Sequence, residues 1–193
     1  MTDTHHTNDT GAPVPVGDVV PGDPPVPITV WPVPAPRRGE TMSNRLGVRL
    51  VHGFTHPADL IIDLTDGPQL ARAIINARRR SHLQSAKTVG WGKENAPLIV
   101  TGWPAARALA QEFFGLCRAK LLPGGCVAVL LAHGDPTLPA DVVAAAKAAR
   151  LAYLQHIVAA TDAIVRGGTG LLSIHTDVLM LTRSAVEDGG ADG

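Results

Sequence analysis

The sequence predicts an α/β protein whose open, Rossmann-like sheet is mostly parallel, is reduced in strand number and ends in an antiparallel hairpin. Between Leu98 and Ala132, two apolar runs flank an amphipathic helix. Upstream, the apolar run from Pro57 to Gly67 passes directly into another helical segment. Near the C-terminus, two β-rich runs are separated only by VRGGTG. Two strands that are connected through a helix lie parallel in a sheet, whereas two strands that are connected by a short turn lie antiparallel.

The central unit begins with LIVTGWP, from Leu98 to Pro104, which is too short for a helix and rich in β-branched residues, as in a buried strand. A helix follows Pro104, because apolar residues then recur at three- and four-residue spacing. Its apolar face comprises Ala106, Leu109, Ala110, Phe113 and Cys117. The helix ends at LLPGG, and Cys126 to Ala132 form the second buried strand.

The remaining elements are predicted from similar patterns. The strand at Pro57 to Gly67 leads into a helix over about Pro68 to Arg80, whose last turn holds Arg78, Arg79 and Arg80 and complements the helix C-terminal charge. The run from Ala86 to Gly92 is a second short strand. A helix over Pro139 to Arg150 precedes the hairpin. The last strand, near Ile174 to Leu181, is expected to lie antiparallel between its neighbours.

Composition divides the chain into three parts. Residues 1–36 hold most of the prolines and are expected to form a disordered arm, with Trp31 pinning its end onto the domain. Residues 37–184 form one folded domain, within which spaced apolar residues permit a helix between Arg37 and Thr55. Residues 185–193 form an acidic, glycine-rich tail that need not order.

Charge and cysteine content limit the classes of partner. The formal net charge is zero, so no global field attracts nucleic acid or an acidic membrane, and any polyanion binding must be local. Cys117 and Cys126 lack partners at metal-ligand spacing, which predicts reduced, buried thiols and no metal. The chain has no apolar run of membrane-spanning length and no signal core. We therefore expect a cytoplasmic protein with no membrane association.

Several strings resemble those of class I S-adenosylmethionine-dependent methyltransferases, and in particular the DNA methylases that modify exocyclic amines. The PADLIID segment (Pro57 to Asp63) resembles the entry into the first strand of the family. The LLPGGCVAV segment (Leu121 to Val129) is similar to a strand start common to the class. The HTDVLM segment (His175 to Met180) resembles the last strand of the DNA methylase branch. The resemblance covers roughly residues 38–183.

This resemblance implies a site for S-adenosylmethionine at the carboxyl ends of the first and fourth strands. The residues there are Asp63, Thr65, Gly67, Thr101 and Gly102. The family pattern is incomplete, because Gln69 stands where a second glycine lets the backbone approach the cofactor. The acidic residue that accepts the ribose hydroxyls falls at Gly92, and Glu94 is two residues late.

The catalytic tetrapeptide of the branch also departs from its pattern, since its positions read Gly102, Trp103, Pro104 and Ala105. The residue that holds the target amine and the aromatic ring that stacks on a flipped base are both missing. Trp103 is either a displaced stacking platform or a filler of the volume left by the cofactor, with the second favoured. Asp63 has about equal chances of a cofactor role and a turn-capping role.

Two functions remain from the sequence. The first is a degenerate DNA-methyltransferase-like protein, a non-catalytic binding or subunit module with a protein partner, in which S-adenosylmethionine binding is weak or lost. The second is an active methyltransferase on DNA or another acceptor, with Thr101, Trp103 or Glu94 recruited. DNA remains a partner without support from charge. His133, His156 and His175 suggest no catalytic constellation. An unrelated α/β binding domain remains if the hairpin prediction fails.

Overall fold

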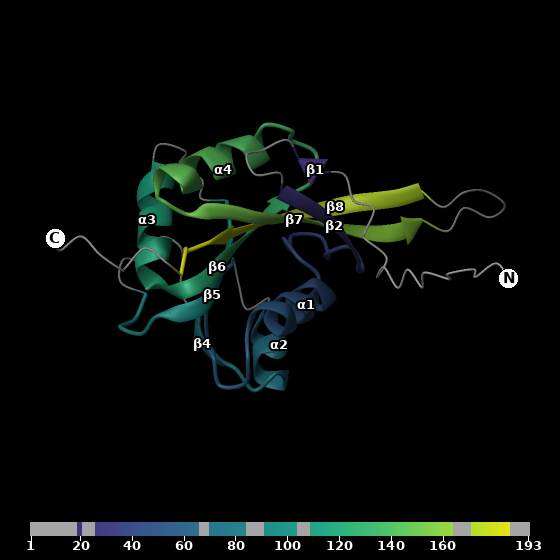
Figure 1. Ribbon diagram of the computed structural model, residues 1–193. Coiled ribbons are helices and arrows are strands. Elements are labelled where there is room, and N and C mark those ends of the chain that lie inside the picture. Colours follow the sequence, from purple (N-terminus) through teal and green to yellow (C-terminus); the bar gives the residue numbers. More distant parts are fainter. Residues whose placement is uncertain are drawn as a thin grey trace, which may run out of the picture.

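The structure is a computed structural model that describes residues 19–20, 26–65, 70–83, 91–103, 109–163 and 171–185. Its strands form one twisted sheet in the order β1-β2-β7-β8-β6-β5-β3-β4 (Figure 1). The strands are β1 (Val19–Val20), β2 (Val26–Pro32), β3 (Leu60–Leu64), β4 (Arg80–Leu83), β5 (Ala96–Gly102), β6 (Leu121–Ala132), β7 (Ala152–Ala163) and β8 (Leu171–Thr182). The helices are α1 (Asn44–Phe54), α2 (Ala71–Asn76), α3 (Ala110–Lys120) and α4 (Leu138–Ala148).

The predicted topology is confirmed. Strands β4, β3, β5 and β6 run parallel to one another, and β8 lies antiparallel between β6 and β7. One described strand, β4, lies between β3 and β5 in the chain. Strands β1 and β2 bring the sheet to eight strands, more than the reduced number that the sequence predicts. The fold is therefore an open α/β sheet of Rossmann-like type with an antiparallel C-terminal hairpin.

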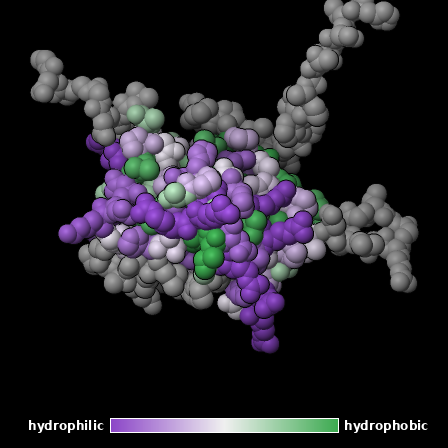
Figure 2. All heavy atoms as spheres, turned by 90° about the horizontal axis from the view of Figure 1, so that it is seen from below, coloured by the Kyte–Doolittle hydropathy of each residue, from purple (hydrophilic) through white to green (hydrophobic). Residues whose placement is uncertain are grey.

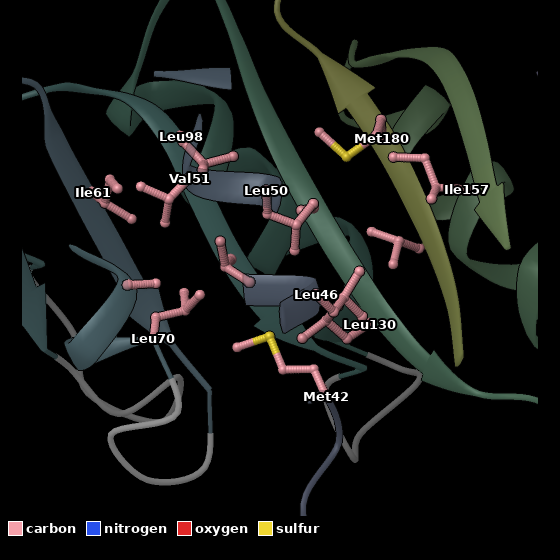
Figure 3. Packing of buried hydrophobic residues seen from close by; sticks show 14 of the residues in the cluster. Met42, Leu46, Leu50, Val51, Ile61, Leu70, Leu98, Leu130, Ile157 and Met180 are labelled. Carbon is pink, nitrogen blue, oxygen red and sulfur yellow. The ribbon is translucent and has the colours of Figure 1, made fainter. Parts of the chain in front are cut away.

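Two hydrophobic clusters hold helices to the two faces of the sheet. On one face, Leu46, Leu50 and Val51 of α1 pack with Leu70 and Ile74 against the strands (Figure 3). On the other face, Phe113, Phe114 and Cys117 of α3 and Val142 of α4 pack against the alternate strand residues. The alternation of side chains along each strand supplies both clusters, which is why the central strands are apolar throughout.

The N-terminal arm enters the sheet, which corrects the predicted boundary at residue 36. Strand β2 pairs in parallel with β7, from Ile28 opposite His156 to Pro32 opposite Ala160. Val26 and Val33 are buried, and the guanidinium of Arg49 lies 5.2 Å from the ring centre of Trp31. The prolines of β2 are tolerated because it is the outermost long strand, beside only the two-residue β1. The predicted anchoring role of Trp31 is confirmed.

The segment after α2 also differs from the prediction. Helix α2 ends at Asn76, so none of the three arginines lies in its last turn. Arg78 turns the chain with φ +55°, and Arg80 begins β4. Arg79 instead binds the end of α1, because its guanidinium donates to the Thr55 hydroxyl (3.1 Å) and carbonyl (2.7 Å). The second parallel strand is therefore Arg80–Leu83, earlier than the predicted range of Ala86 to Gly92. Residues 86–90 of that range lie outside the described residues, and Trp91 and Gly92 are not in a strand.

Strand β6 starts earlier than predicted, at Leu121, and includes the LLPGG segment. Gly125 is buried there, and a Cβ atom on it would lie 2.9 Å from the Leu122 carbonyl oxygen and 3.1 Å from that of Pro97. Glycine is therefore required where this strand starts. Cys117 and Cys126 are both buried free thiols, and burial raises the pKa of each. No helix among the described residues is long and apolar enough to cross a membrane.

Candidate functional site

The parallel strands β3, β5 and β6 place their carboxyl ends along one edge of the sheet. Leu64 pairs with Thr101, and Gly102 pairs with Leu130, so Thr65 and Gly102 lie at the same level on adjacent strands. Ligands of open α/β sheets bind at this edge. The structure thus brings together four of the five predicted cofactor-site residues: Asp63, Thr65, Thr101 and Gly102. The fifth, Gly67, lies outside the described residues, as does Gln69.

Asp63 is fully buried, and its carboxylate forms hydrogen bonds with Thr65, the residue that follows β3. Its Oδ1 atom accepts hydrogen bonds from the Thr65 amide (3.0 Å) and the Thr65 hydroxyl (2.6 Å). Its Oδ2 atom is buried and has no hydrogen-bond partner among the residues described. Burial raises the pKa of Asp63, although its hydrogen bonds with Thr65 oppose the shift. In this structure, then, Asp63 acts as a turn-capping residue.

Thr101 and Gly102 end β5 beside Asp63 but face different environments. The Thr101 side chain is buried, and its hydroxyl donates to the carbonyl of Gly102 (2.9 Å). Gly102 is half-buried, and a Cβ atom on it would meet no described atom within 4 Å. A side chain at position 102 therefore has space. Packing therefore does not require a glycine at this position. The DNA methylases that the sequence resembles carry Asp, Asn or Ser there.

Trp103 points toward α3. It is half-buried, and its ring centre lies 6.3 Å from that of Phe114, with the planes tilted by 41°. It packs against the hydrophobic cluster under α3 and α4. This contact favours the volume-filling role over a stacking platform for a base. Pro104 and Ala105, which complete the degenerate tetrapeptide, lie outside the described residues.

The positions proposed for the ribose-binding acid require correction. Glu94 pairs with Arg80 (2.9 Å), the first residue of β4, and Gly92 precedes the start of β5. Both residues therefore lie toward the amino ends of the strands, opposite the edge that holds Asp63. The equivalent acid would follow Leu83, and the sequence from Gln84 to Lys93 contains no Asp or Glu. The shorter second strand moves the position but does not restore the acid.

A cluster of two histidines and one aspartate lies on another part of the sheet, which sequence reasoning missed. Asp177 of β8 is bonded through Oδ2 to His133 Nδ1 (2.8 Å) and through Oδ1 to His156 Nε2 (2.9 Å). Burial alone would raise the pKa of Asp177, but hydrogen bonds from His156 and His133 outweigh it and lower the pKa. Among the described residues, no group of three or more His, Cys, Asp or Glu side chains is placed to hold a metal ion.

The members of this cluster differ in exposure. The side chain of His133 is 44% exposed, whereas those of His156 and Asp177 are 13% and 10% exposed. His133 follows the carboxyl end of β6, so its ring lies at the same edge of the sheet as Gly102. An imidazole oriented by a buried carboxylate has the geometry of a general base with its orienting residue. His175 is separate, since its Nε2 contacts the Val33 carbonyl oxygen (3.2 Å).

A cavity of about 460 Å³ opens beside the amino end of α1. Its charged lining residues are Arg37, Arg45, Arg72 and Glu40. Helix α1 leads into the amino end of β3, and α2 follows the carboxyl end of β3, so the amino ends of both helices lie at the ligand-binding edge. The cavity thus borders the candidate site, although Asp63 does not line it.

Comparison with known proteins supports the fold. No family model and no curated protein matches the sequence. A candidate methyltransferase from Thermoplasma acidophilum superposes with TM-score 0.50 at 12% identity, over 82% of this chain and 68% of that one. A candidate sarcosine dimethylglycine methyltransferase from Galdieria sulphuraria gives TM-score 0.52 at 9% identity, over 74% and 85% of the two chains.

A third structure, a SAM-dependent methyltransferase from Methanosarcina mazei, gives TM-score 0.44 at 10% identity, over 70% of this chain and 97% of that one. The two structures that reach a TM-score of 0.50 or more are both candidate methyltransferases. The chain has the Rossmann-like fold of class I methyltransferases, and identities this low show the fold alone.

Proposed function

We propose that this chain is a degenerate DNA-methyltransferase-like protein that does not transfer methyl groups and serves as a binding or subunit module for a protein partner. The observation that carries this proposal is the state of Asp63. Its side chain has no exposed surface, and both Thr65 donors use its Oδ1 atom. In this conformation the carboxylate of Asp63 offers no exposed surface for a cofactor to contact.

The surrounding residues support the same reading. The sequence from Gln84 to Lys93 offers no acid to accept ribose hydroxyls, and an absent charged acceptor typically removes about 1.5–3 kcal/mol of binding. Gln69 occupies the position of a glycine, which adds a steric cost. The cavity at this edge is lined by three arginines, and cationic side chains disfavour the sulfonium charge of S-adenosylmethionine. The residues present therefore fit this cofactor poorly.

The test is calorimetric titration of S-adenosylmethionine and S-adenosylhomocysteine into the purified protein. We expect binding in the millimolar range or none, and no transfer of tritiated methyl groups to duplex or single-stranded DNA. Micromolar binding with turnover that Asp63→Ala abolishes would overturn the proposal. Because Asp63→Ala could unfold the protein, the matched variant is Asp63→Asn, provided that its melting temperature is no lower than that of the unmodified chain.

An active methyltransferase acting on DNA or another acceptor is the second candidate, and the geometry of His133 favours it. A half-exposed imidazole oriented by buried Asp177 at the ligand edge could accept the proton that an acceptor amine or hydroxyl must lose. Glu94 is not a candidate for this role, because it lies toward the opposite edge. If transfer to any acceptor is found, loss of that activity in His133→Gln, with binding retained, would support this candidate.

A further inference from the structure

The distribution of charge in this neutral chain is strongly uneven. Residues 1–25 and 186–193 contain seven of the seventeen acidic residues and no Lys or Arg. Between residues 37 and 80 there are eight arginines and four acidic residues. One of those acids, Asp63, is fully buried. A zero net charge therefore conceals a basic layer around α1 and α2.

Three of these arginines surround the cavity beside α1, and they come from three separate segments. Arg37 precedes α1, Arg45 lies in its first turn, and Arg72 lies in α2. All three side chains are exposed, and none forms an ion pair with a residue that the structure describes. Figure 2 shows the molecule from below the view of Figure 1, and hydrophilic side chains cover much of the face seen there.

Glu40 is the one acidic residue among the described residues that line the cavity, and the three arginines outnumber it. A Glu40 Oε2 atom accepts a hydrogen bond from the backbone amide of Arg37 (3.3 Å). Three guanidinium groups against one carboxylate leave an excess of positive charge on a concave surface. Such a surface attracts anions, because a concave wall of low dielectric focuses the field of its charges.

We propose that this cavity binds a phosphate group. Guanidinium groups match phosphate geometry through paired hydrogen bonds, which makes arginine the usual residue for this ligand. The volume of about 460 Å³ exceeds what a lone phosphate fills and lies within the range of small-molecule sites. The ligand is therefore a phosphate carried by a larger group, either a free nucleotide or the backbone of a nucleic acid strand.

This inference deepens the proposed function, since it names the ligand class of a module without methyl transfer. The test compares the full-length chain with R45Q/R72Q, in which two guanidinium groups are removed from exposed positions. The matched control is K93Q/K147Q, which removes the same charge from exposed lysines that do not line the cavity. The probes are ADP, measured by calorimetry, and a short fluorescein-labelled single-stranded oligonucleotide, measured by anisotropy.

We expect the unmodified chain to bind at least one probe and R45Q/R72Q to bind it about tenfold or more weakly. The affinity of the control variant should stay within about twofold of that of the unmodified chain. The slope of log K against log salt concentration for oligonucleotide binding should fall by the equivalent of roughly one to two phosphate contacts, and only in R45Q/R72Q. Binding of ADP alone would assign a free nucleotide, and binding of the oligonucleotide alone would assign a nucleic acid backbone.

Absence of binding by both probes, or equal weakening in both double variants, would overturn the inference. The outcome is separable from that of the proposed function, because S-adenosylmethionine is a different probe. Micromolar binding and turnover of that cofactor would refute the non-catalytic proposal whatever the phosphate probes show. Failure of the phosphate probes leaves the cofactor titration unaffected.

Discussion

Two buried aspartates, Asp63 and Asp177, lie in opposite electrostatic environments. Asp177 receives hydrogen bonds from two imidazoles, which lower its pKa, whereas Asp63 has one oxygen without a described partner and a raised pKa. A carboxylate that the fold does not favour in its charged form is typical of a ligand site, whether the site is active or inherited. The two residues should therefore respond to neutralisation in opposite ways.

We predict that Asp63→Asn stabilises the protein at about pH 7. The pKa of Asp63 is raised in the folded state, so its protonated form stabilises the fold below the unfolded pKa, and this contribution is lost as pH rises through the folded pKa. Asn keeps an acceptor for Thr65 without the charge. The expected gain is about 0.5–2 kcal/mol, the usual range for stabilising substitutions, and is measured by urea unfolding. A gain of equal size at pH 3 would contradict this explanation.

Asp177→Asn should have the reverse effect. Because the folded pKa of Asp177 is lowered, its charged form contributes stability above the unfolded pKa, and this contribution is lost as pH falls through the folded pKa. Hydrogen bonds to a charged group are typically worth about 1.5–3 kcal/mol, so we expect a loss of that order at about pH 7. Unfolding curves at pH 7 and near pH 2 measure it, and the difference from the unmodified chain should shrink in acid.

At the scale of single elements, the start of β6 gives a sharp test of packing. Gly125→Ala places a Cβ atom against the carbonyl oxygens of Leu122, Pro97 and Ala96, none of which is a flexible side chain. We expect a loss of about 1–3 kcal/mol, as for other overpacked sites. Gly102→Ala is the matched control, because a Cβ atom there meets no described atom within 4 Å. Thermal melts of both variants measure this difference in stability, and equal melting temperatures would refute the predicted packing requirement at Gly125.

Strand β2 gives a second test at this scale. Deletion of residues 1–18 should leave stability nearly unchanged, whereas deletion of residues 1–36 removes the strand that pairs with β7. Burial of Val26 and Val33 is worth about 1.5–3 kcal/mol each, so we expect the longer deletion to cost about 3 kcal/mol or more. Urea midpoints of the two truncated chains measure the difference. A small loss in the longer deletion would mean that β2 is dispensable.

Across the whole molecule, the sequence predicts the order of the sheet better than its edges. A helix between apolar runs requires a parallel pair, and the short VRGGTG link requires a hairpin, so the topology follows from local patterns. Strand β2 was missed because Pro27 and Pro32 lie within it and its partner β7 is distant in sequence. Strand β4 was placed too late because the three arginines resemble a helix terminus.

The candidate site divides in the same way. Asp63, Thr101 and Gly102 could be placed together, because they end adjacent parallel strands. The Asp177 cluster could not, because it needs the register of β8 with β6 and β7, and hydrophobic alternation gives only the face of a side chain. The arginine-lined cavity was hidden by a net charge of zero, since composition averages over tails and domain.

The parallel pairing of β2 with β7 also has a consequence for synthesis of the chain on the ribosome. Ile28 emerges early, but its partner His156 is made only after all four described helices and every described strand except β7 itself and β8. During that interval, β2 has no long partner strand and exposes its hydrogen-bonding groups. Completion of the fold must therefore wait for the last quarter of the chain, and contacts this distant in sequence slow folding. The nascent N-terminus would then be the segment most in need of protection by a chaperone.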